Sequence, residues 1–295
     1  MSELSGSKWR EARWWRLASD EAAAICGLCF HKCRIRKGAV GTCGARGFFN
    51  DSDNVFASPH LGKFVSVASD PIEKKPLRRW RPGTYILSLG GLRCNMACPF
   101  CQNHSIAHPM GDLREREITP EQLAEIAEGS SLEAVAYTYN EPLLQAEYIF
   151  EASPVLRERG IATVMVTNGT FGEAVCEEAV HNVDAMNIDL KTFDKETYKK
   201  LGGSLEAVTR NIRRLVDGGV HVELSNLVVP GISDSEESFA GMVSWIAEVS
   251  SEIPLHVSQY HPAYQYRAAP VGIGLIKRFR DIALCKLKYV YTGNI

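Results

Sequence analysis

Residues 84–103 read TYILSLGGLRCNMACPFCQN, a short apolar run followed at once by a loop with three cysteines. The run TYILSL (84–89) has the length and composition of a buried β-strand, and a glycine pair follows it. The loop behind it carries Cys94, Cys98 and Cys101. Reactive residues at the carboxyl end of a strand are typical of α/β enzymes, in which the loops at that end form the site.

Five further apolar runs follow this strand, and amphipathic segments separate them. The runs are rich in Val, Ile, Leu and Tyr, as buried parallel strands are. They are LEAVAYTY (132–139), IATVMV (161–166), VDAMNIDL (183–190), VHVELSNLVV (220–229) and IPLHVSQY (253–260). Helical patterns cover 119–130, 142–160, 204–219 and 234–250, with Thr119 as a candidate N-cap. The alternation predicts a parallel sheet with right-handed crossovers.

The ends of the predicted strands distinguish a barrel from an open sheet. An open sheet gathers its polar residues at one switch point, whereas a barrel carries them at every strand end. Here a polar signature follows each run: the cysteine loop, NEP (140–142), TNG (167–169), Asp189 with Lys191, PG (230–231) and YHP (260–262). We therefore predict an α/β fold built on a partial (β/α)6 barrel of the TIM type.

Three regions follow from this prediction. The barrel covers residues 81–262, and an N-terminal segment with four cysteines covers residues 1–80. A C-terminal extension at 263–295 contains a helical pattern near 272–283 and the strand-like KLKYVYTGN. No internal repeat accompanies them.

The composition is that of an ordinary globular protein, with 45% hydrophobic residues, 23% charged residues and a formal net charge of -2. This balance gives no reason to expect nucleic-acid binding, and the basic run KKPLRRWR (74–81) fits a solvated face or a link between domains. The N-terminus lacks the apolar core of a signal peptide, and no run approaches the roughly 18 apolar residues of a membrane span. We therefore expect a cytoplasmic protein.

Nine cysteines in a reducing compartment are poor candidates for disulfides, and closely spaced ones favour metal ligands or catalytic groups. Seven of the nine fall into two groups, one at 26–43 and one at 94–101. Cys176 and Cys285 stand apart in a helical and an apolar pattern. We predict that these two are small buried hydrophobic residues.

The loop at 94–101 offers three thiols, one fewer than a closed tetrahedral site needs. A zinc site completed by His104 is one interpretation. The other is an iron–sulfur cluster, which short runs of cysteines hold as thiolates. A four-iron cluster held by three thiolates leaves one iron without a protein ligand, and an open position separates catalytic metal sites from structural ones.

The spacing C-x3-C-x2-C, with Phe100 before the last cysteine, resembles the signature of the radical S-adenosylmethionine (SAM) superfamily. The resemblance implies a [4Fe–4S] cluster at Cys94, Cys98 and Cys101 whose fourth iron binds the amino and carboxylate groups of SAM. One electron from the cluster then splits the sulfonium and gives a 5′-deoxyadenosyl radical. Spacing, flanking aromatic residue and placement behind a strand agree, so we favour this interpretation over zinc.

The same resemblance implies roles for residues at the other strand ends. Glu141, preceded by Asn140, stands where the superfamily has a Gly-Gly-Glu motif that binds the SAM ammonium. The remaining candidate SAM contacts are Thr167, Asn168, Asp189, Lys191, Val229 (within 228–231, beside the adenine and near Phe100) and His256.

Each of these residues also has a structural interpretation. Asn168 with Gly169 is a common turn pair, and Glu141 suits the first turn of a helix. Asp189 and Lys191 share one face of a strand and can form an ion pair, while a lone histidine such as His256 often has a structural hydrogen bond. Their coincidence at successive strand ends favours the functional interpretation.

Residues 26–43 read CGLCFHKCRIRKGAVGTC, a second group with the spacing C-x2-C-x3-C-x9-C. Cys26, Cys29, Cys33 and Cys43 can close a tetrahedral zinc site or hold a second [4Fe–4S] cluster. Four ligands leave no open position, so we predict a structural or electron-relay role for this group. Thiolates suit both metals, so the spacing leaves the metal open.

Over nearly its full length the chain resembles the AmmeMemoRadiSam-system radical SAM enzymes, relatives of the pyruvate formate-lyase (glycyl radical enzyme) activating enzymes. The stretches that carry this resemblance are DPIEKKPL (70–77), YTYNEP (137–142), VTNG (166–169), NIDLK (187–191), VVPG (228–231), HVSQYHP (256–262) and YVYTGN (289–294). It implies an oxidoreductase of the activating-enzyme type, with a flavodoxin or ferredoxin as electron donor. The implied substrate is a glycine of a partner protein, and the alternative is a small molecule or another protein residue.

A hypothesis of another class is a non-enzymatic scaffold. In that hypothesis both cysteine groups bind zinc, and the basic run 74–81 docks RNA or a protein partner. Iron and sulfide analysis separates the two hypotheses, because a zinc protein contains neither.

Overall fold

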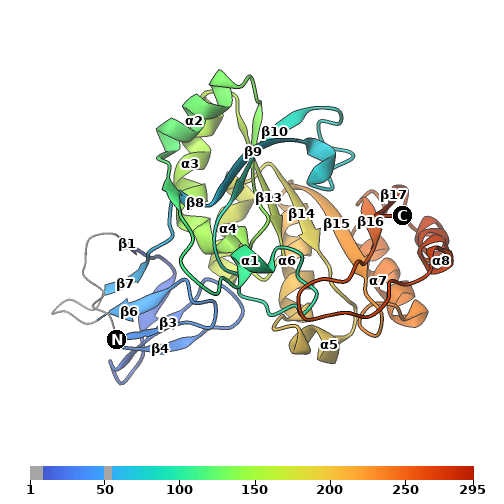
Figure 1. The fold of residues 1–295 in the computed structure, drawn as a ribbon, viewed down its shortest axis with the longest axis horizontal. Coiled ribbons are helices and arrows are strands. Elements are labelled where there is room, and N and C mark those ends of the chain that lie inside the picture. Colours follow the sequence, from blue (N-terminus) through green and yellow to red (C-terminus); the bar gives the residue numbers. More distant parts are fainter. Residues whose placement is uncertain (1–8, 50–54) are drawn as a thin grey trace.

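The computed structural model describes residues 9–49 and 55–295, and an eight-stranded sheet is its main element (Figure 1). The strand order is β17-β16-β15-β14-β13-β12-β10-β9. Its parallel strands are β10 (Tyr85–Gly90), β12 (Ala134–Thr138), β13 (Ala162–Thr167), β14 (Ala185–Asp189), β15 (His221–Val228), β16 (Leu255–Gln259) and β17 (Val290–Gly293). The six predicted strands and the fold class of a partial parallel barrel are confirmed.

The two edges of this sheet differ from the prediction. β17 lies in the region assigned to a C-terminal extension, but it pairs in parallel with β16 and adds a seventh parallel strand. At the other edge β9 (Ser66–Pro71) runs antiparallel to β10. In this sheet β9 pairs only with β10, and β17 pairs only with β16. The curved sheet therefore does not close into a complete barrel, and the side between these two edges is open.

Helices cover the outer face of the sheet and alternate with its parallel strands along the chain (Figure 1). The longer ones are α2 (Pro120–Gly129), α3 (Ala146–Glu158), α4 (Glu173–Asn182), α6 (Leu205–Asp217), α7 (Glu236–Val249) and α8 (Ile273–Leu284). Short turns complete the set: η1 (Ile72–Lys74), α1 (His104–Ala107), η2 (Pro142–Gln145) and α5 (Lys195–Lys200). The predicted cap at Thr119 is confirmed, because its side chain and that of Gln122 form a reciprocal capping box.

Small side chains on the inner face of the strands leave room for a segment that fills one end of the barrel. Ala134, Ala136 and Ala185 pack in one buried cluster with Ile72 and Leu77, which follow β9. The segment enters at the amino-terminal ends of the strands. The opposite, carboxyl-terminal end is therefore the one left for chemistry.

The basic run 74–81 belongs to this filling segment, and internal partners hold much of its charge. Lys75 is fully buried and donates to Asp70 at 2.8 Å, while Lys74 donates to the other oxygen of Asp70 at 2.7 Å. The guanidinium of Arg79 lies 4.1 Å from the ring centre of Tyr289. The run therefore ties β9 to the far edge of the sheet, which offers little support for a surface that docks RNA.

The N-terminal part of the chain forms small antiparallel sheets beside the barrel (Figure 1, blue). One sheet has the order β1-β7-β6-β5, a second has the order β2-β3-β4, and a third pairs β8 with β11. Their bounds are β1 (Arg10–Glu11), β2 (Trp15–Leu17), β3 (Ala23–Cys26), β4 (Arg34–Arg36), β5 (Ala39–Val40), β6 (Gly47–Phe49), β7 (Val55–Ser58), β8 (Lys63–Phe64) and β11 (Arg116–Glu117). Among residues 9–49 and 55–295, no helix is long and apolar enough to cross a lipid bilayer.

Candidate active site at the carboxyl ends of the strands

The cysteine loop leaves β10 at the carboxyl end of the barrel, and backbone contacts from distant parts of the chain hold it. The N–H of Ala97 donates to the carbonyl of Leu201 at 2.9 Å, and the N–H of Gln265 donates to the carbonyl of Pro99 at 2.9 Å. Cys98 is buried, and Cys94 and Cys101 are half-buried. These contacts therefore fix the backbone conformation of the loop.

Asn140, at the end of β12, holds the start of this loop. Its Oδ1 accepts a hydrogen bond from the N–H of Gly91 at 2.9 Å, and its Nδ2 lies 3.1 Å from the carbonyl oxygens of both Leu92 and Arg93. These contacts occupy the amide of Asn140 with backbone. The structure thus gives Asn140 a positioning role next to Cys94, where the sequence left its role open.

The Glu141 carboxylate lies at the centre of the site and is 2% exposed. Oε1 accepts hydrogen bonds from the Thr167 hydroxyl at 2.6 Å and from the N–H of Leu143 at 3.0 Å, while Oε2 accepts one from the N–H of Asn168 at 2.8 Å. Burial raises the pKa of Glu141 to about 7, against the effect of these donors. The ends of β12 and β13 therefore meet at one buried acid.

Asn168 connects this acid to the cysteine loop. Its Nδ2 donates to Oδ1 of Asn95 at 2.8 Å and lies 3.9 Å from the sulfur of Cys94. Its Oδ1 accepts from the Thr170 hydroxyl at 2.7 Å, and the Thr170 hydroxyl also accepts from Asn95. A closed set of amide and hydroxyl contacts thus surrounds Cys94.

Asp189 and Lys191 form an ion pair of 2.6 Å at the end of β14. Burial works to lower the pKa of Lys191, but Asp189 and then Cys98 outweigh it, so the pKa is raised. The Lys191 ammonium in turn opposes the effect of burial on the pKa of Cys98 and of Cys101. Lys191 is therefore a fixed cation close to the cysteine loop, which suits a site that collects thiolates or an anionic group.

The hydrogen bonds of the nine cysteines separate grouped from isolated thiols. In both groups a backbone N–H two residues on approaches the sulfur, as Met96 does at Cys94 (3.4 Å), Asn103 at Cys101 and Leu28 at Cys26. Cys176 and Cys285 instead lie near backbone carbonyls, of Asn211 at 3.9 Å and Asp281 at 3.3 Å. Cys176 is buried as predicted, but Cys285 is exposed, so the prediction is wrong for Cys285. A sulfur that accepts N–H groups suits a thiolate ligand, and one that faces a carbonyl suits a protonated thiol.

The donor set at the loop fits an iron–sulfur cluster in its chemistry. It comprises three cysteines on one short loop, N–H groups directed at sulfur and a nearby ammonium. Across residues 9–49 and 55–295, no three His, Cys, Asp or Glu side chains already stand where they could share a metal ion.

His104, the residue that would complete a zinc site, has other contacts. Its ring stacks on Tyr264 with centroids 4.7 Å apart, and its Nδ1 lies 3.3 Å from the carbonyl oxygen of Cys101. His108 stacks on the same tyrosine at 6.0 Å. The interpretation of the loop as a zinc site with His104 gains no support from this arrangement.

Two further predicted SAM contacts are buried in the core around the site. Phe100 is 4% exposed and Val229 is 1% exposed, with the N–H of Val229 donating to the Ser233 hydroxyl at 2.8 Å. The structure places both in the hydrophobic core cluster that also contains Cys98. Both side chains are therefore enclosed by neighbouring residues of the core.

His256 has different partners from the other predicted contacts. Its Nε2 lies 2.7 Å from a carboxylate oxygen of Glu223, and its ring stacks on Tyr291 at 5.2 Å. Burial works to raise the pKa of Glu223, but hydrogen bonds from His221, His256 and the backbone of the filling segment hold it at about 2. Within the described part of the chain, none of these contacts joins His256 to the cysteine loop.

The structure also contributes residues that sequence reasoning missed. Asn95 has no signal in the sequence beyond its place between two cysteines, yet it is 3% exposed and makes hydrogen bonds with His31, Thr170 and Asn168. Leu201 and Gln265 hold the loop through backbone atoms, which leave no signal in the sequence. The carboxylate of Glu223 was visible as an acid inside an apolar run, and a partner for it could have been sought.

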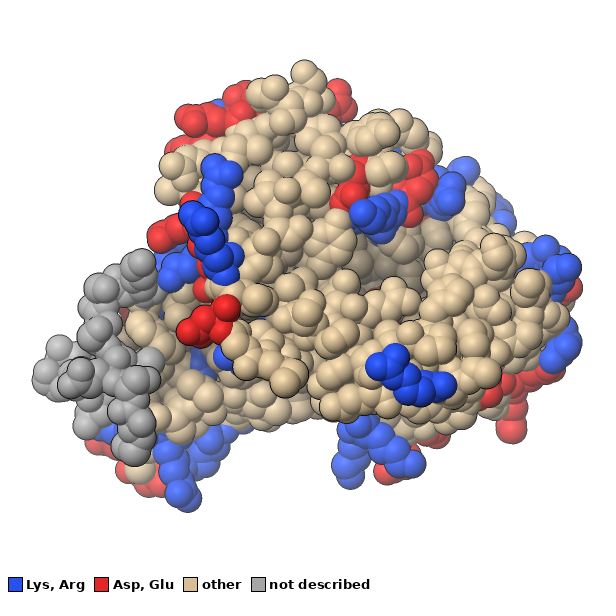
Figure 2. Space-filling model, viewed as in Figure 1, with Lys and Arg blue, Asp and Glu red and all other residues tan. Residues whose placement is uncertain are grey.

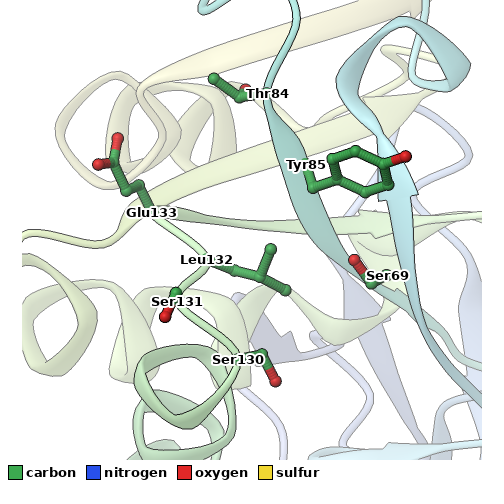
Figure 3. Close-up of a pocket in the computed structure, with 7 residues that line it drawn as sticks. All are labelled: Ser69, Thr84, Tyr85, Ser130, Ser131, Leu132 and Glu133. Atoms are coloured by element: carbon green, nitrogen blue, oxygen red, sulfur yellow. The ribbon is translucent and has the colours of Figure 1, made fainter.

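Two hollows on the surface differ in their relation to this site. Figure 2 shows a hollow between the filling segment and strands β15 and β16, on the open side of the barrel, with acidic and basic side chains mixed around it. A surface pocket of about 450 Å³ is lined by Ser69, Thr84, Tyr85, Ser130, Ser131, Leu132 and Glu133 (Figure 3). It lies at the amino-terminal ends of β10 and β12, so it is remote from the cysteine loop.

Comparison with known proteins agrees with this geometry. A family model for the radical SAM superfamily matches residues 89–245, which include the cysteine loop and the ends of five strands. An uncharacterized protein of Methanocaldococcus jannaschii is 35% identical over 291 residues, 97% of this chain and 85% of that protein. The pyruvate formate-lyase-activating enzyme of Clostridium pasteurianum is 25% identical over 175 residues, 57% of this chain and 72% of that enzyme.

A solved structure supports the fold. SuiB of Streptococcus suis, bound to S-adenosylmethionine, superposes with a TM-score of 0.54 at 15% identity, over 69% of this chain and 48% of that one. At this identity the likeness concerns the arrangement of strands and helices and not the chemistry.

Proposed function

The chain belongs to the radical SAM superfamily and is an enzyme, and we propose from this that it cleaves SAM at the loop 94–101 to abstract a hydrogen atom from a substrate. The observation that carries the proposal is the meeting of three grouped cysteines, a buried acid and a half-buried cation at the carboxyl ends of β10, β12 and β14. Each of these groups has a different task in holding a cluster and a sulfonium amino acid.

Cys94, Cys98 and Cys101 would hold a [4Fe–4S] cluster as thiolates. When bound, the cluster supplies the one electron that cleaves the sulfonium to methionine and a 5′-deoxyadenosyl radical. The N–H of Met96 and the amide of Asn168 lower the negative charge on Cys94 by donating to its sulfur. Three thiolates leave one position for the amino acid part of SAM.

Glu141 and Lys191 would bind the charged ends of SAM. Oε2 of Glu141 accepts a single hydrogen bond from the protein, so it can accept another from an ammonium group. The Lys191 ammonium, shared with Asp189, can pair with a carboxylate. Thr167 and Asn168 orient Glu141. Phe100 and Val229 are buried in the core next to the site and would support the apolar surroundings of an adenine.

The substrate class follows from the relatives rather than from the site. The similarity to a pyruvate formate-lyase-activating enzyme supports a glycine in a partner protein, from which the radical takes a hydrogen atom to form 5′-deoxyadenosine. A small molecule or another protein residue is the second candidate.

We further propose that Cys26, Cys29, Cys33 and Cys43 hold a second metal centre, either zinc or a [4Fe–4S] cluster. Burial raises the pKa of Cys26 and of Cys43, and the Arg46 guanidinium works against this at both. A cation beside four cysteines suits the negative charge of a metal–thiolate group. A flavodoxin or ferredoxin is the proposed electron donor.

The test is anaerobic incubation of the reconstituted protein with SAM and dithionite, followed by chromatography for 5′-deoxyadenosine. We expect this product from the wild-type protein and its absence from Cys98→Ala. Incubation with a partner protein deuterated at glycine should then move deuterium into 5′-deoxyadenosine. A colourless wild-type protein that binds zinc at both groups and forms no product would contradict the proposal and favour a non-enzymatic scaffold.

A further inference from the structure

The N-terminal cysteine segment lies directly on the loop that follows β13, with backbone against backbone. The N–H of Phe30 donates to the carbonyl of Thr170 at 3.1 Å, and the N–H of Gly172 donates to the carbonyl of Leu28 at 2.8 Å. A Cβ at Gly172 would lie 2.0 Å from the carbonyl oxygen of Gly27, so only glycine allows this approach. The two segments are therefore in direct backbone contact, with no side chain between them at Gly172.

A single buried side chain, that of Asn95, connects the two cysteine groups. Asn95 follows Cys94 in the chain, and its side chain works against the rise that burial causes in the pKa of the Cys29 thiol. Its backbone carbonyl oxygen lies 2.9 Å from Nε2 of His31, two residues after Cys29. Its Oδ1 accepts from Asn168, which itself lies 3.9 Å from the sulfur of Cys94. Asn95 therefore lies between the segment that carries Cys29 and the sulfur of Cys94.

A buried ion pair keeps the two parts in this arrangement. Arg46, which follows Cys43 by three residues, donates to Glu147 of α3, and the two side chains are 1% and 2% exposed. Arg46 also donates to the carbonyl of Arg13 at 2.9 Å. Separating the segment from the barrel would leave each of these charges without its partner, which is energetically costly. The ion pair therefore keeps the segment against the barrel, with Asn95 between the two cysteine groups.

The N-terminal cysteine group has a buried side and a side near solvent. Cys26 and Cys29 are buried and face the barrel, whereas Cys33 and Cys43 are half-buried. The exposed side chains that flank Cys33 in the sequence are basic, namely Lys32, Arg34, Arg36 and Lys37, and Arg34 forms an ion pair with Asp20. Figure 2 shows basic side chains gathered at the lower left, below β3 and β4. An acidic electron carrier could bind these basic side chains by electrostatic attraction, and it would then lie close to Cys33.

We propose that Cys26, Cys29, Cys33 and Cys43 hold a redox-active iron–sulfur cluster, which relays electrons from an acidic carrier through Asn95 to the centre at Cys94, Cys98 and Cys101. This inference rests on the proposed function. Zinc has no redox chemistry and would only hold its own loops together, which needs no hydrogen bond to the catalytic loop. Transfer of an electron needs two centres that lie close together, and the backbone contacts between the two cysteine segments provide this.

The electrons balance over one turnover. A reduced one-electron carrier of low potential, of the ferredoxin or flavodoxin class, gives one electron to the N-terminal centre. That centre passes the electron to the second centre and returns to its oxidised state. The electron finally enters the sulfonium of SAM, whose C–S bond breaks to methionine and a 5′-deoxyadenosyl radical, and the radical takes a hydrogen atom from the substrate.

Metal analysis of the anaerobically reconstituted wild-type protein is the first test. We expect about eight iron and about eight sulfide per chain, and about two unpaired spins per chain after reduction by dithionite. About four iron with one zinc, and about one spin, would overturn the relay. If that zinc-containing protein still forms 5′-deoxyadenosine, the relay alone is wrong. If the wild-type protein forms none with dithionite, the proposed function fails as well.

The second test compares two electron sources in Cys33→Ala. We expect this variant to lose about half of its iron, to keep the change in electron paramagnetic resonance on addition of SAM, and to form 5′-deoxyadenosine about tenfold more slowly with reduced ferredoxin. Reduced methyl viologen, which is small enough to reach the second centre directly, should restore the wild-type rate. Equal loss with both electron sources would show a structural role and overturn the relay. Cys176→Ala, an isolated buried cysteine, is the control.

The third test concerns Asn95 as a positioning residue. Asn95→Leu keeps the number of side-chain heavy atoms and all seven grouped cysteines but removes the amide from beside Cys29 and its bonds with Thr170 and Asn168. We expect both centres to be present and transfer between them to slow about tenfold in freeze-quench resonance. Thr170→Val disturbs the same polar network without touching Cys29 and should transfer at nearly the wild-type rate. Wild-type transfer in Asn95→Leu would exclude Asn95 from the path.

Discussion

The two cysteine groups use the same side chain in different surroundings. The loop 94–101 lies at the end of β10, next to the acid Glu141 and the cation Lys191. The segment 26–43 lies among short antiparallel strands, and the charged side chain that acts on the pKa of Cys26 and of Cys43 is that of Arg46. One group therefore has the partners that a charged ligand needs, and the other has partners that only balance its own charge.

This difference teaches that the number of thiols and their neighbours must be considered together. Three cysteines alone are compatible with a zinc site, and four alone are compatible with a cluster. The surrounding acid and ammonium decide for the first group, because they match the two charged ends of an amino acid. The second group lacks such a pair within the described residues that contact it.

Removing one cysteine from each group should separate their roles most strongly. Cys98→Ala takes away one of only three ligands, so we expect 5′-deoxyadenosine formation with SAM and dithionite to fall to the level without enzyme. Cys29→Ala takes a ligand from a group without an open position, so part of the activity with dithionite should persist. Circular dichroism must first show that both variants are folded. Full activity in Cys98→Ala would remove the basis of the comparison.

The junction between the two regions should be the next most sensitive place. Glu147→Gln leaves the Arg46 guanidinium buried without its carboxylate, and breaking such a pair costs about 3–5 kcal/mol in the free energy of unfolding. Anaerobic urea titration measures the change. Glu151→Gln on the same helix is the matched control, because its partner Arg10 is 41% exposed and such pairs contribute at most about 1 kcal/mol. Similar losses in both variants would show that the junction is not held by the buried pair.

The barrel could be predicted from the sequence because its strands combine length, composition and position. Each of the six apolar runs is followed by polar residues, and parallel strands bring those ends together without further information. The contacts of Glu141 with Thr167 and Asn168 are a direct result of that topology. The edges were harder, because β17 has four half-buried residues and β9 runs against its neighbour, so neither repeats the pattern of the central strands.

The connection between the cysteine groups could not be predicted from the sequence, because it depends on tertiary contacts. Asn95 stands 66 residues from Cys29 in the chain, and a polar spacer inside a metal-binding loop is ordinary. Gly172 is one glycine among 24, and only the carbonyl of Gly27 explains why no side chain fits there. The pairing of His256 with the buried Glu223 on the neighbouring strand β15 likewise depends on tertiary contacts, and its role toward SAM stays a prediction.

The acid at the centre of the loop site gives a pH test that the N-terminal group lacks. Burial raises the pKa of Glu141 to about 7, so part of the protein has a neutral Glu141 at that pH. An ammonium binds the carboxylate form, so the affinity for SAM should increase with pH, by about tenfold between pH 6 and pH 8. Equilibrium binding with labelled SAM measures this. Glu141→Gln should lose the dependence, and any that persists in the variant belongs to SAM itself.

The smallest effect is expected at an isolated cysteine, and it tests whether grouping is what matters. Cys285 is exposed, and its sulfur lies 3.3 Å from the carbonyl of Asp281, as a protonated thiol would. Because a serine hydroxyl can make the same contact, Cys285→Ser should change the free energy of unfolding by less than about 0.5 kcal/mol. Iron content and 5′-deoxyadenosine formation should equal those of the wild type. A loss of iron in this variant would place Cys285 among the ligands and end the distinction between grouped and isolated thiols.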